Sequence, residues 1–185
     1  MNLLVFLLSY LMGSLSPSHI LARKTFKEDL QGKGSGNLGA LNTYRNYGSL
    51  AGALVFLLDA AKGALSVYLA LLLAVNPFWA LAGVVCGHNY SVFLKFKGGK
   101  GLASAFGALL LIDFRYAAVL VMVGAVILAF SRNKYPTSVL SAGLLPVVIL
   151  YFDPSPLSLV LGLFTAFLII VKHRHNFQSW VERNK

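Results

Sequence analysis

Long apolar runs dominate this sequence and decide which solvent it can fold in. A helix needs about 20 mostly apolar residues to cross a bilayer, with a usual range of about 17–25. Seven runs are candidates for such helices: residues 2–22, 50–75, 77–94, 102–112, 114–130, 136–152 and 156–171. Hydrophobic residues make up 57% of the 185 residues and charged residues only 12%, so a water-soluble fold would expose far more apolar surface than its core could hide. We therefore predict an all-α, polytopic membrane protein that forms a single domain over residues 1–185.

The run 102–112 is the shortest, and its length alone does not decide whether it crosses the membrane. At 1.5 Å per residue its 11 residues cover about 16 Å, which is half of a hydrocarbon core. The basic residues bear on the question, because 14 of the 16 Lys and Arg lie in four segments between or after the runs: 23–49, 95–101, 131–135 and 172–185.

The positions of these basic segments predict the topology. If 102–112 crosses the membrane, all four segments lie on one face, which the positive-inside rule makes cytoplasmic. We therefore predict seven transmembrane helices, with the N-terminus outside and the C-terminus in the cytoplasm. On this interpretation most of the formal net charge of +10 is a topology signal, and we expect no nucleic-acid partner.

Cysteine and histidine usage argues against a metal site. Cys86 is the single cysteine, which excludes an internal disulfide and a multi-cysteine zinc site. His173 and His175 are two residues apart and do not share a helix face, and the sequence contains no HExxH motif. We expect neither a metal ion nor a cofactor.

A glycine-rich stretch in the first basic segment predicts an anion-binding loop. Residues 32–45 read GKGSGNLGALNTYR. Glycine lets backbone N–H groups converge on an anion, while hydroxyl and amide groups add hydrogen bonds and a guanidinium matches phosphate. The candidate phosphate-binding residues are Gly34, Ser35, Gly36, Asn37, Gly39, Asn42 and Arg45.

Two alternative interpretations of this stretch are a flexible linker and a dinucleotide-binding loop. A Gly-rich loop can be a flexible linker, although linkers lack this mixture of Asn, Thr and Arg. The letters Gly34-x-Gly36-x-x-Gly39 also match the dinucleotide fingerprint, with Asp59 20 residues later. That fingerprint requires a strand before it and a helix after it, whereas here a charged loop precedes it and Asp59 lies in an apolar run.

A second glycine-rich cluster lies at the end of the run 77–94 and in the segment after it. It begins at Gly87-His88, where His88 is a candidate substrate-binding residue. It ends in Gly98-Gly99-Lys100-Gly101, where the glycines suit a backbone anion cradle around one point charge. Lys95 and Lys97 are interpreted as residues that snorkel to the membrane surface.

Two further sets of polar residues are candidates for the site. His173 and Asn176 are three residues apart and face one side if the last helix continues, and histidine is suited to acid–base chemistry near neutral pH. Asp59 and Lys62 form an i, i+3 pair of opposite charge inside the run 50–75. We interpret this pair as structural or secondary, since the two charges can neutralise each other.

Two other classes of protein could use the same basic face. A phosphate-ester transporter or channel would need polar residues that continue across the membrane, and the apolar runs offer few beyond Asp59, Lys62 and His19. An odd number of spans also argues against an inverted-repeat transporter. A lipid-binding scaffold is the third reading.

Four blocks in this order resemble the bacterial membrane glycerol-3-phosphate acyltransferases of the PlsY family, which use acyl-phosphate as donor. The blocks are GSGNLGALNTYR (34–45), Asp59-x-x-Lys62-Gly63, GHNYSVFLKFKGGKG (87–101) and His173-x-x-Asn176. The resemblance extends along essentially the whole chain, and Leu41 stands where the family more often has Thr.

The resemblance implies an activity and a location. It implies acyl transfer from acyl-phosphate to glycerol-3-phosphate, which gives 1-acyl-glycerol-3-phosphate and phosphate in the first acylation of phospholipid synthesis. It also implies an enzyme integral to the bacterial inner membrane, in contact with membrane lipid, with its active site at the cytoplasmic face; a monomer is favoured. It assigns catalytic roles to Ser35, Asn37, Arg45, Lys100, His173 and Asn176.

The chemistry that this resemblance implies needs no nucleophilic residue. Acyl-phosphate is an activated mixed anhydride, and the sequence has no GxSxG motif, so we expect no covalent acyl-enzyme. Our hypothesis is that Arg45 and Lys100 bind phosphates while His173 orients glycerol-3-phosphate or takes its proton. In a rival mechanism, a phosphate oxygen of the substrate accepts the proton.

Overall fold

The protein is helical throughout the part that its structure, a computed structural model, describes: the backbone of residues 1–132 and 134–183, and the side chains of 1–132 and 136–174. No strand occurs among these residues. The elements are α1 (Asn2–Ser14), α2 (Pro17–Thr25), the 3₁₀ turn η1 (Leu30–Gly32), α3 (Ala40–Leu72), α4 (Phe78–Asn89), the 3₁₀ turn η2 (Val92–Leu94), α5 (Leu102–Ile112), α6 (Phe114–Ser131), α7 (Lys134–Phe152) and α8 (Pro156–Arg183).

All seven apolar runs form helices, although they differ in length. Four helical segments are long and apolar enough to cross a membrane: Asn2–Thr25, Ala40–Leu72, Phe114–Ser131 and Pro156–Arg174. Three apolar segments are shorter: Phe78–Leu94, Leu102–Ile112 and Pro136–Phe152. The all-helical membrane fold is therefore confirmed, whereas seven crossings and their orientation stay predictions.

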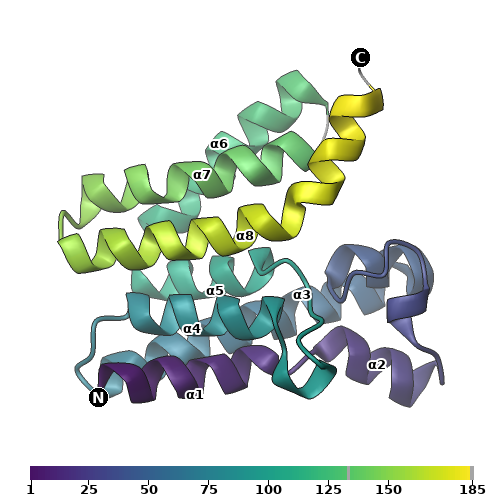
Figure 1. Ribbon diagram of the computed structural model, residues 1–185, viewed down its shortest axis with the longest axis horizontal. Coiled ribbons are helices and arrows are strands. Elements are labelled where there is room, and N and C mark those ends of the chain that lie inside the picture. The colour runs from purple at the N-terminus through teal and green to yellow at the C-terminus, as the bar shows by residue number, and fades with distance from the viewer. Residues whose placement is uncertain (133, 184–185) are drawn as a thin grey trace.

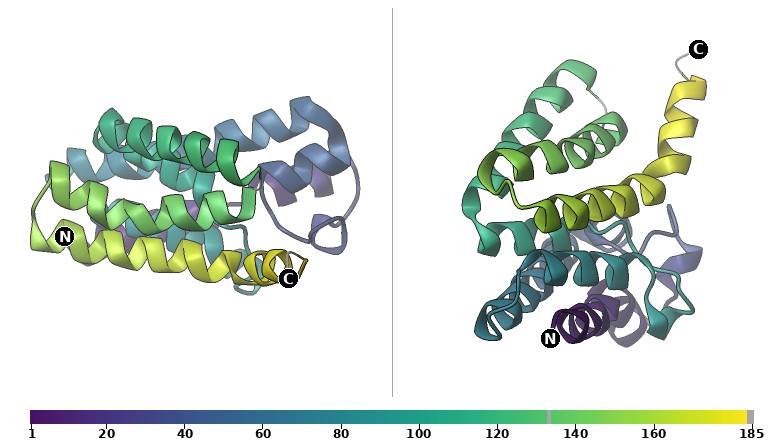
Figure 2. Two further views of the ribbon diagram at one scale, coloured as in Figure 1. Left: turned by 90° about the horizontal axis from the view of Figure 1, so that it is seen from above. Right: turned by 60° about the vertical axis from the view of Figure 1, so that its left-hand side comes forward.

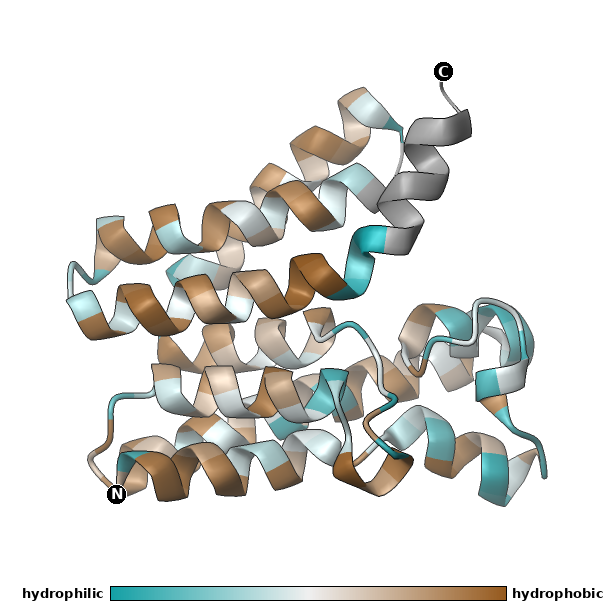
Figure 3. Cartoon of the chain, viewed as in Figure 1, coloured by the Kyte–Doolittle hydropathy of each residue, from teal (hydrophilic) through white to brown (hydrophobic). Residues whose placement is uncertain are grey.

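The helices form two groups that meet along α4, α5 and α8. In one group α1 packs on α4 and α3 packs on α5; in the other, α7 lies between α6 and α8. Contacts between α4 and α8 join the groups (Figures 1 and 2). Hydrophilic residues gather mainly at the end of the bundle that carries α2 and the loop after it (Figure 3).

Glycines let the helices of the first group approach closely. A Cβ added to Gly83 would lie 2.5 Å from the carbonyl oxygen of Phe6, and one added to Gly87 would overlap that of Tyr10. Gly63 and Gly107 are equally crowded between α3 and α5. Small residues spaced four apart are a common way for helices to pack in a membrane, where no hydrophobic effect drives their association.

The run 2–22 is broken into two helices at Leu15, whose backbone is extended. Pro17 begins α2, where its missing N–H costs no hydrogen bond. The break leaves carbonyl groups at the end of α1, and the ammonium of Lys62 donates to two of them, Gly13 O at 3.0 Å and Leu15 O at 2.7 Å.

The helix α3 begins ten residues before the predicted run and reverses direction at Gly48. Gly48 has φ 89° and ψ 176°, a conformation that is nearly exclusive to glycine. The preceding stretch, residues 40–47, folds back against Gly52, where an added Cβ would lie 2.6 Å from the Cβ of Tyr44. This short helical stretch is part of the segment that a flexible linker would have left unstructured.

Candidate active site

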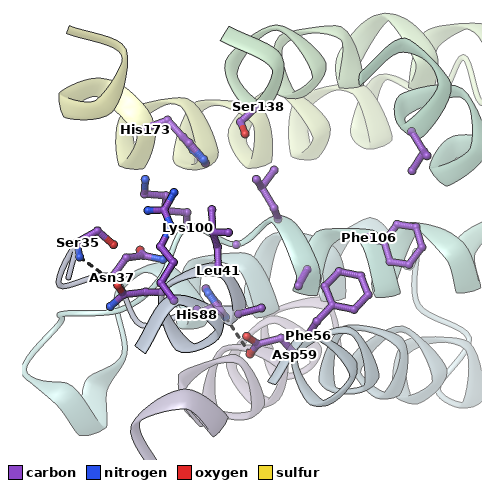
Figure 4. Close-up of a pocket in the computed structure, with 18 residues that line it drawn as sticks. Ser35, Asn37, Leu41, Phe56, Asp59, His88, Lys100, Phe106, Ser138 and His173 are labelled. Atoms are coloured by element: carbon purple, nitrogen blue, oxygen red, sulfur yellow. Dashed lines mark hydrogen bonds and ion pairs between the residues drawn. The ribbon is translucent and has the colours of Figure 1, made fainter. Parts of the chain in front are cut away.

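A cavity of about 590 Å³ lies at the end of the bundle where the glycine-rich segments meet. Residues from the loop before α3, from α3 itself, and from α4 to α8 form its walls. Lys100 lies between the two groups of helices, with Leu41, His88 and Asp59 on one side and Ser138 and His173 on the other (Figure 4). The lining residues are Ser35, Asn37, Gly39, Ala40, Leu41, Asn42, Arg45, Phe56, Asp59, His88, Lys100, Gly101, Leu102, Ala103, Phe106, Val121, Ser138 and His173.

The N-terminus of α3 forms one wall of this cavity. Gly39 is the N-cap residue, and no side chain in the described part of the chain caps the helix. The first N–H groups of a helix have no partner within the helix and carry a positive partial charge, so they attract anions. Ser35, Asn37 and Arg45 line the cavity beside this end.

Asn42 folds the loop that leads into α3. Its Oδ1 accepts from the backbone N–H of Ser35 at 3.0 Å, and its Nδ2 donates to the carbonyl oxygen of Lys33, also at 3.0 Å. Gly34 and Gly36 have left-handed φ angles of 57° and 66°. Both glycines shape the loop but do not line the cavity, and their contact with substrate stays a prediction.

The N-terminus of α5 forms a second wall. Gly101 is its N-cap residue, with φ 81°, and no cap from a side chain is present among the described residues. Lys100, Gly101, Leu102 and Ala103 all line the cavity. Two helix N-termini, each with a nearby cation, therefore face one cavity.

Gly98 and Gly99 pack against His88 and do not line the cavity. The backbone N–H of Gly99 donates to the carbonyl oxygen of His88 at 2.9 Å. A Cβ on Gly99 would overlap the His88 ring, and one on Gly98 would overlap the His88 carbonyl. The sequence predicted these glycines as an anion cradle, whereas the structure places them where only glycine lets the loop approach α4.

His173 reaches the cavity from α8 with a defined tautomer. Its Nδ1 lies 2.8 Å from the carbonyl oxygen of Ile169. A carbonyl can only accept, so Nδ1 carries a proton, and in the neutral imidazole Nε2 then keeps its lone pair. The ring points from α8 toward Lys100 (Figure 4). Asn176 belongs to the same helix, but its side chain lies outside the described residues.

Asp59, Lys62 and His88 form a buried polar cluster below the cavity. The Lys62 ammonium lies 2.8 Å from Asp59 Oδ1, as the i, i+3 spacing predicts. On the other side, His88 Nδ1 lies 3.3 Å from Asp59 Oδ1 and 3.2 Å from Ser104 Oγ. Asp59 and His88 line the cavity, whereas Lys62 does not.

The sequence reasoning missed the apolar wall of the cavity. The missed lining residues are Ala40, Leu41, Phe56, Leu102, Ala103, Phe106, Val121 and Ser138. Most lie in helices where an apolar residue is ordinary, so they carry no signal of their own. Ser138, a hydroxyl within an apolar run, is the one that could have been noticed.

A smaller, mostly apolar cavity of about 160 Å³ adjoins the first and shares Leu102, Phe106 and Val121 with it. Within the described side chains, no group of three or more His, Cys, Asp and Glu is placed to hold a metal ion.

The comparison with known proteins is consistent along the whole chain. Residues 3–183 match the sequence model of a family described as glycerol-3-phosphate acyltransferase. A protein named glycerol-3-phosphate acyltransferase from Carboxydothermus hydrogenoformans is 36% identical over 180 residues, which cover 96% of this chain and 92% of that protein. One of the same name from Trichlorobacter lovleyi is 38% identical over 178 residues, or 94% and 90% of the two chains.

Solved structures show the same fold. The crystal structure of PlsY, an integral membrane glycerol 3-phosphate acyltransferase, in its glycerol 3-phosphate form superposes with a TM-score of 0.90. The identity is 29%, and the match covers 100% of this chain and 94% of that one. The lysophosphatidic acid form of PlsY gives a TM-score of 0.84 at 28% identity, covering 100% and 93%.

Proposed function

The chain belongs to the glycerol-3-phosphate acyltransferase family, and from this premise we propose that it takes its acyl group from acyl-phosphate, without forming a covalent acyl-enzyme. It is an acyltransferase of the PlsY family, which carries out the first step of phospholipid synthesis. The donor, the route of the acyl group and the roles of individual residues belong to the proposal.

The observation that carries the proposal is the pair of helix N-termini in one cavity. Arg45 lines the cavity together with the start of α3. Lys100 directly precedes Gly101, the N-cap residue of α5. Each combination of free backbone N–H groups and a cation suits one phosphate. Glycerol-3-phosphate and acyl-phosphate each carry one phosphate, so two such sites would hold both substrates side by side.

The geometry around Ser104 supports direct transfer. A serine nucleophile needs a base within hydrogen-bond reach and a third group that orients the base. Asp59, His88 and Ser104 resemble such a triad, but the carboxylate and the hydroxyl both approach the same ring nitrogen, Nδ1. Ser104 is also fully buried. This cluster therefore does not supply an activated serine.

In the proposed reaction, a glycerol-3-phosphate hydroxyl attacks the carbonyl carbon of acyl-phosphate. The new C–O ester bond forms as the bond from that carbon to the phosphate oxygen breaks, and phosphate leaves with the bonding electrons. The hydroxyl proton goes to His173 Nε2 or to a phosphate oxygen of the substrate. The N–H groups at the helix start that holds acyl-phosphate stabilise the charge that develops on the leaving phosphate.

The apolar wall suits the acyl chain. Phe56, Leu102, Phe106 and Val121 lie on the side of the cavity that continues into the smaller one. An acyl chain along this wall keeps its phosphate at the polar end and its methylenes out of water.

The assay that tests the donor uses purified protein, palmitoyl-phosphate and glycerol-3-phosphate. We expect phosphate release that depends on glycerol-3-phosphate, and no transfer from palmitoyl-CoA or palmitoyl-acyl-carrier protein at matched concentration. Lys100→Ala is the control for transfer at this site. Transfer from either thioester, or phosphate release that is independent of glycerol-3-phosphate, contradicts the proposal.

An isotope-exchange experiment tests the absence of an acyl-enzyme. If the acyl group moved through an enzyme residue, labelled phosphate would enter palmitoyl-phosphate without glycerol-3-phosphate present. Direct transfer predicts no such exchange, together with sequential rather than ping-pong kinetics.

We also propose that the site faces the cytoplasm of an inner membrane that the chain crosses seven times. The basic segments 23–49 and 95–101 supply Arg45 and Lys100 to the cavity, which supports this orientation. Reporters fused after Arg132 and after Lys185 should both be cytoplasmic; an external signal at either position excludes the topology.

A further inference from the structure

We propose that Asp59 and His88 are positioning residues, which hold the loop at Gly98–Gly101 so that Lys100 and the start of α5 face the bound phosphate. This inference deepens the proposed function and rests on it. If Asp59 and Lys62 served only to neutralise each other, the contact of Asp59 with His88 would have no role. The proposal gives that contact a role.

The first step concerns the end of α4, against which the loop Gly98–Gly101 packs. Gly99 N–H donates to the His88 carbonyl at 2.9 Å, and the Gly99 backbone presses against the His88 ring. A Cβ on Gly101 would lie 2.8 Å from Asn89 Oδ1. The last residues of α4 therefore determine the position of the loop Gly98–Gly101.

The second step concerns the hydrogen bonds that fix the end of α4 to neighbouring helices. Asn89 Nδ2 donates to Leu168 O of α8 at 3.1 Å, Ser91 Oγ to Ser14 O of α1 at 2.6 Å, and the hydroxyl of Tyr10 to Tyr90 O at 2.8 Å. The end of α4 is thus tied to helices on both of its sides.

The third step is the orientation of the His88 ring. Asp59 Oδ1, 3.3 Å from Nδ1, and Ser104 Oγ, 3.2 Å from it, fix the ring from α3 and α5. The Lys62 ammonium in turn lies 2.8 Å from Asp59 Oδ1 and is itself held by Gly13 O and Leu15 O. A chain of contacts therefore runs from the end of α1 through Asp59 and His88 to the loop with Lys100.

A purely neutralising pair would not need this chain. Burying an ion pair in a membrane protein gives little net stability, and apolar residues of similar size often pack as well. Asp59 nevertheless turns one carboxylate oxygen to both Lys62 and His88. Its contact with His88 couples the pair to the phosphate loop.

The test is a double-mutant cycle between His88 and Lys100. We expect His88→Leu to lower kcat/KM about 10- to 100-fold, the size of a misplacement of about 1 Å. In the Lys100→Ala background the same change should lower kcat/KM less than about threefold, because the Lys100 side chain that His88 would position is no longer present. His88→Asn, which keeps a donor at the Nδ1 position toward Asp59, should recover most of the loss.

Controls separate this role from general destabilisation. Ser66→Ala removes another buried hydroxyl of α3, which donates to Lys62 O at 2.8 Å, and it should leave kcat/KM unchanged. If His88→Leu does not fold in detergent, the cycle is run with Asp59→Asn. Equal losses in the presence and absence of Lys100, or no loss in either, overturn the inference.

A second measurement keeps the result independent of turnover. The same cycle is followed in the Kd for inorganic phosphate, where the coupling between His88 and Lys100 should again appear. If the wild-type protein transfers no acyl group, the proposed function fails but the phosphate cycle still decides the positioning role. If the wild-type protein is active and the losses add, only the positioning role fails.

Discussion

Asn42 shows how one amide can shape a binding loop through its own hydrogen bonds. Both ends of its side chain are bonded to the backbone of residues 33–35, and the residue is 1% exposed. The sequence predicted a substrate contact for Asn42, since an amide among glycines suits phosphate. The structure shows that the amide first satisfies two backbone groups that would otherwise have no partner.

This arrangement predicts a stability effect. Asn42→Leu should lower the free energy of unfolding by about 1–3 kcal/mol, because it leaves Ser35 N–H and Lys33 O without their partner. Thr43→Val is the matched control, since Gly39 O still accepts from the Thr43 N–H after the hydroxyl is lost. Unfolding in detergent measures both, and equal losses contradict the prediction.

The tautomer of His173 makes a prediction about kinetics. We expect His173→Gln, whose amide reaches the Nε2 position, to retain more activity than His173→Asn, whose amide matches Nδ1. Steady-state kinetics then separate the two proposed roles: a raised KM with kcat unchanged indicates orientation of glycerol-3-phosphate, and a loss of kcat alone indicates a base. Equal activity of both variants would contradict the assignment of Nε2 as the working atom.

Glu28 links the loop after α2 to the short helical stretch of α3. Its carboxylate pairs with Lys33 and accepts from the hydroxyl of Tyr47 at 2.9 Å. These two bonds, Lys33 first, hold the pKa of Glu28 below its ordinary value. A lowered pKa means that the link is present above the ordinary pKa and is lost as the pH falls through the lowered one.

A titration checks this directly. The chain has two glutamates, Glu28 and Glu182, so ¹³C-labelled glutamate gives two carboxyl signals, and Glu182→Gln assigns them. The Glu28 pKa should lie below its ordinary value and should rise in Tyr47→Phe. A value unchanged by that substitution would show that the Tyr47 hydroxyl does not bond to the carboxylate.

Among the elements, α3 differs most from its predicted form. The sequence predicted a span over 50–75 after a long connection, but the helix starts at Ala40 and reverses at Gly48. This start places the N-terminal N–H groups of α3 in the cavity. A hydropathy pattern could not show it, because residues 40–47 are too few to display a period and the reversal depends on one glycine.

The reversal predicts a cost for a side chain at Gly48. Gly48→Ala should destabilise the protein by about 1–3 kcal/mol, since its φ and ψ are nearly exclusive to glycine. Gly143→Ala in α7 is the matched control: no described atom lies within 4 Å of an added Cβ at either position, and alanine favours a helix interior. In detergent, the free energy of unfolding of Gly48→Ala should be lower than that of the wild type, and that of Gly143→Ala should be equal to it or higher.

For the whole molecule, the sequence predicted the composition of the site better than its geometry. The apolar runs and the sidedness of the lysines and arginines were enough to indicate helices and a shared basic face. The segments with Ser35, Arg45, Lys100 and His173 do meet in one cavity. What could not be predicted depends on contacts between distant helices, such as the role of Gly99 against His88 and the apolar wall around Phe106.

That wall predicts which acyl chains are accepted. Ala142 lines the smaller cavity, and Ala142→Phe should fill part of it. We expect the ratio of kcat/KM for palmitoyl-phosphate to that for lauroyl-phosphate to fall about tenfold, since each methylene that loses its place forfeits about 0.8 kcal/mol. Ala125→Phe, at an exposed position of α6, should leave the ratio unchanged, and an unchanged ratio in Ala142→Phe would place the chain elsewhere.

The hydrogen bonds from Lys62 to the broken end of α1 bear on how the chain enters the membrane during synthesis. A lone ammonium is among the most costly groups to release from the translocon into lipid. The acceptors of Lys62, Gly13 O and Leu15 O, belong to a helix made earlier, and Asp59 precedes it by three residues. Every partner that this charge needs has been synthesised by the time it emerges from the ribosome, so α3 can leave the translocon without waiting for the helices that complete the site.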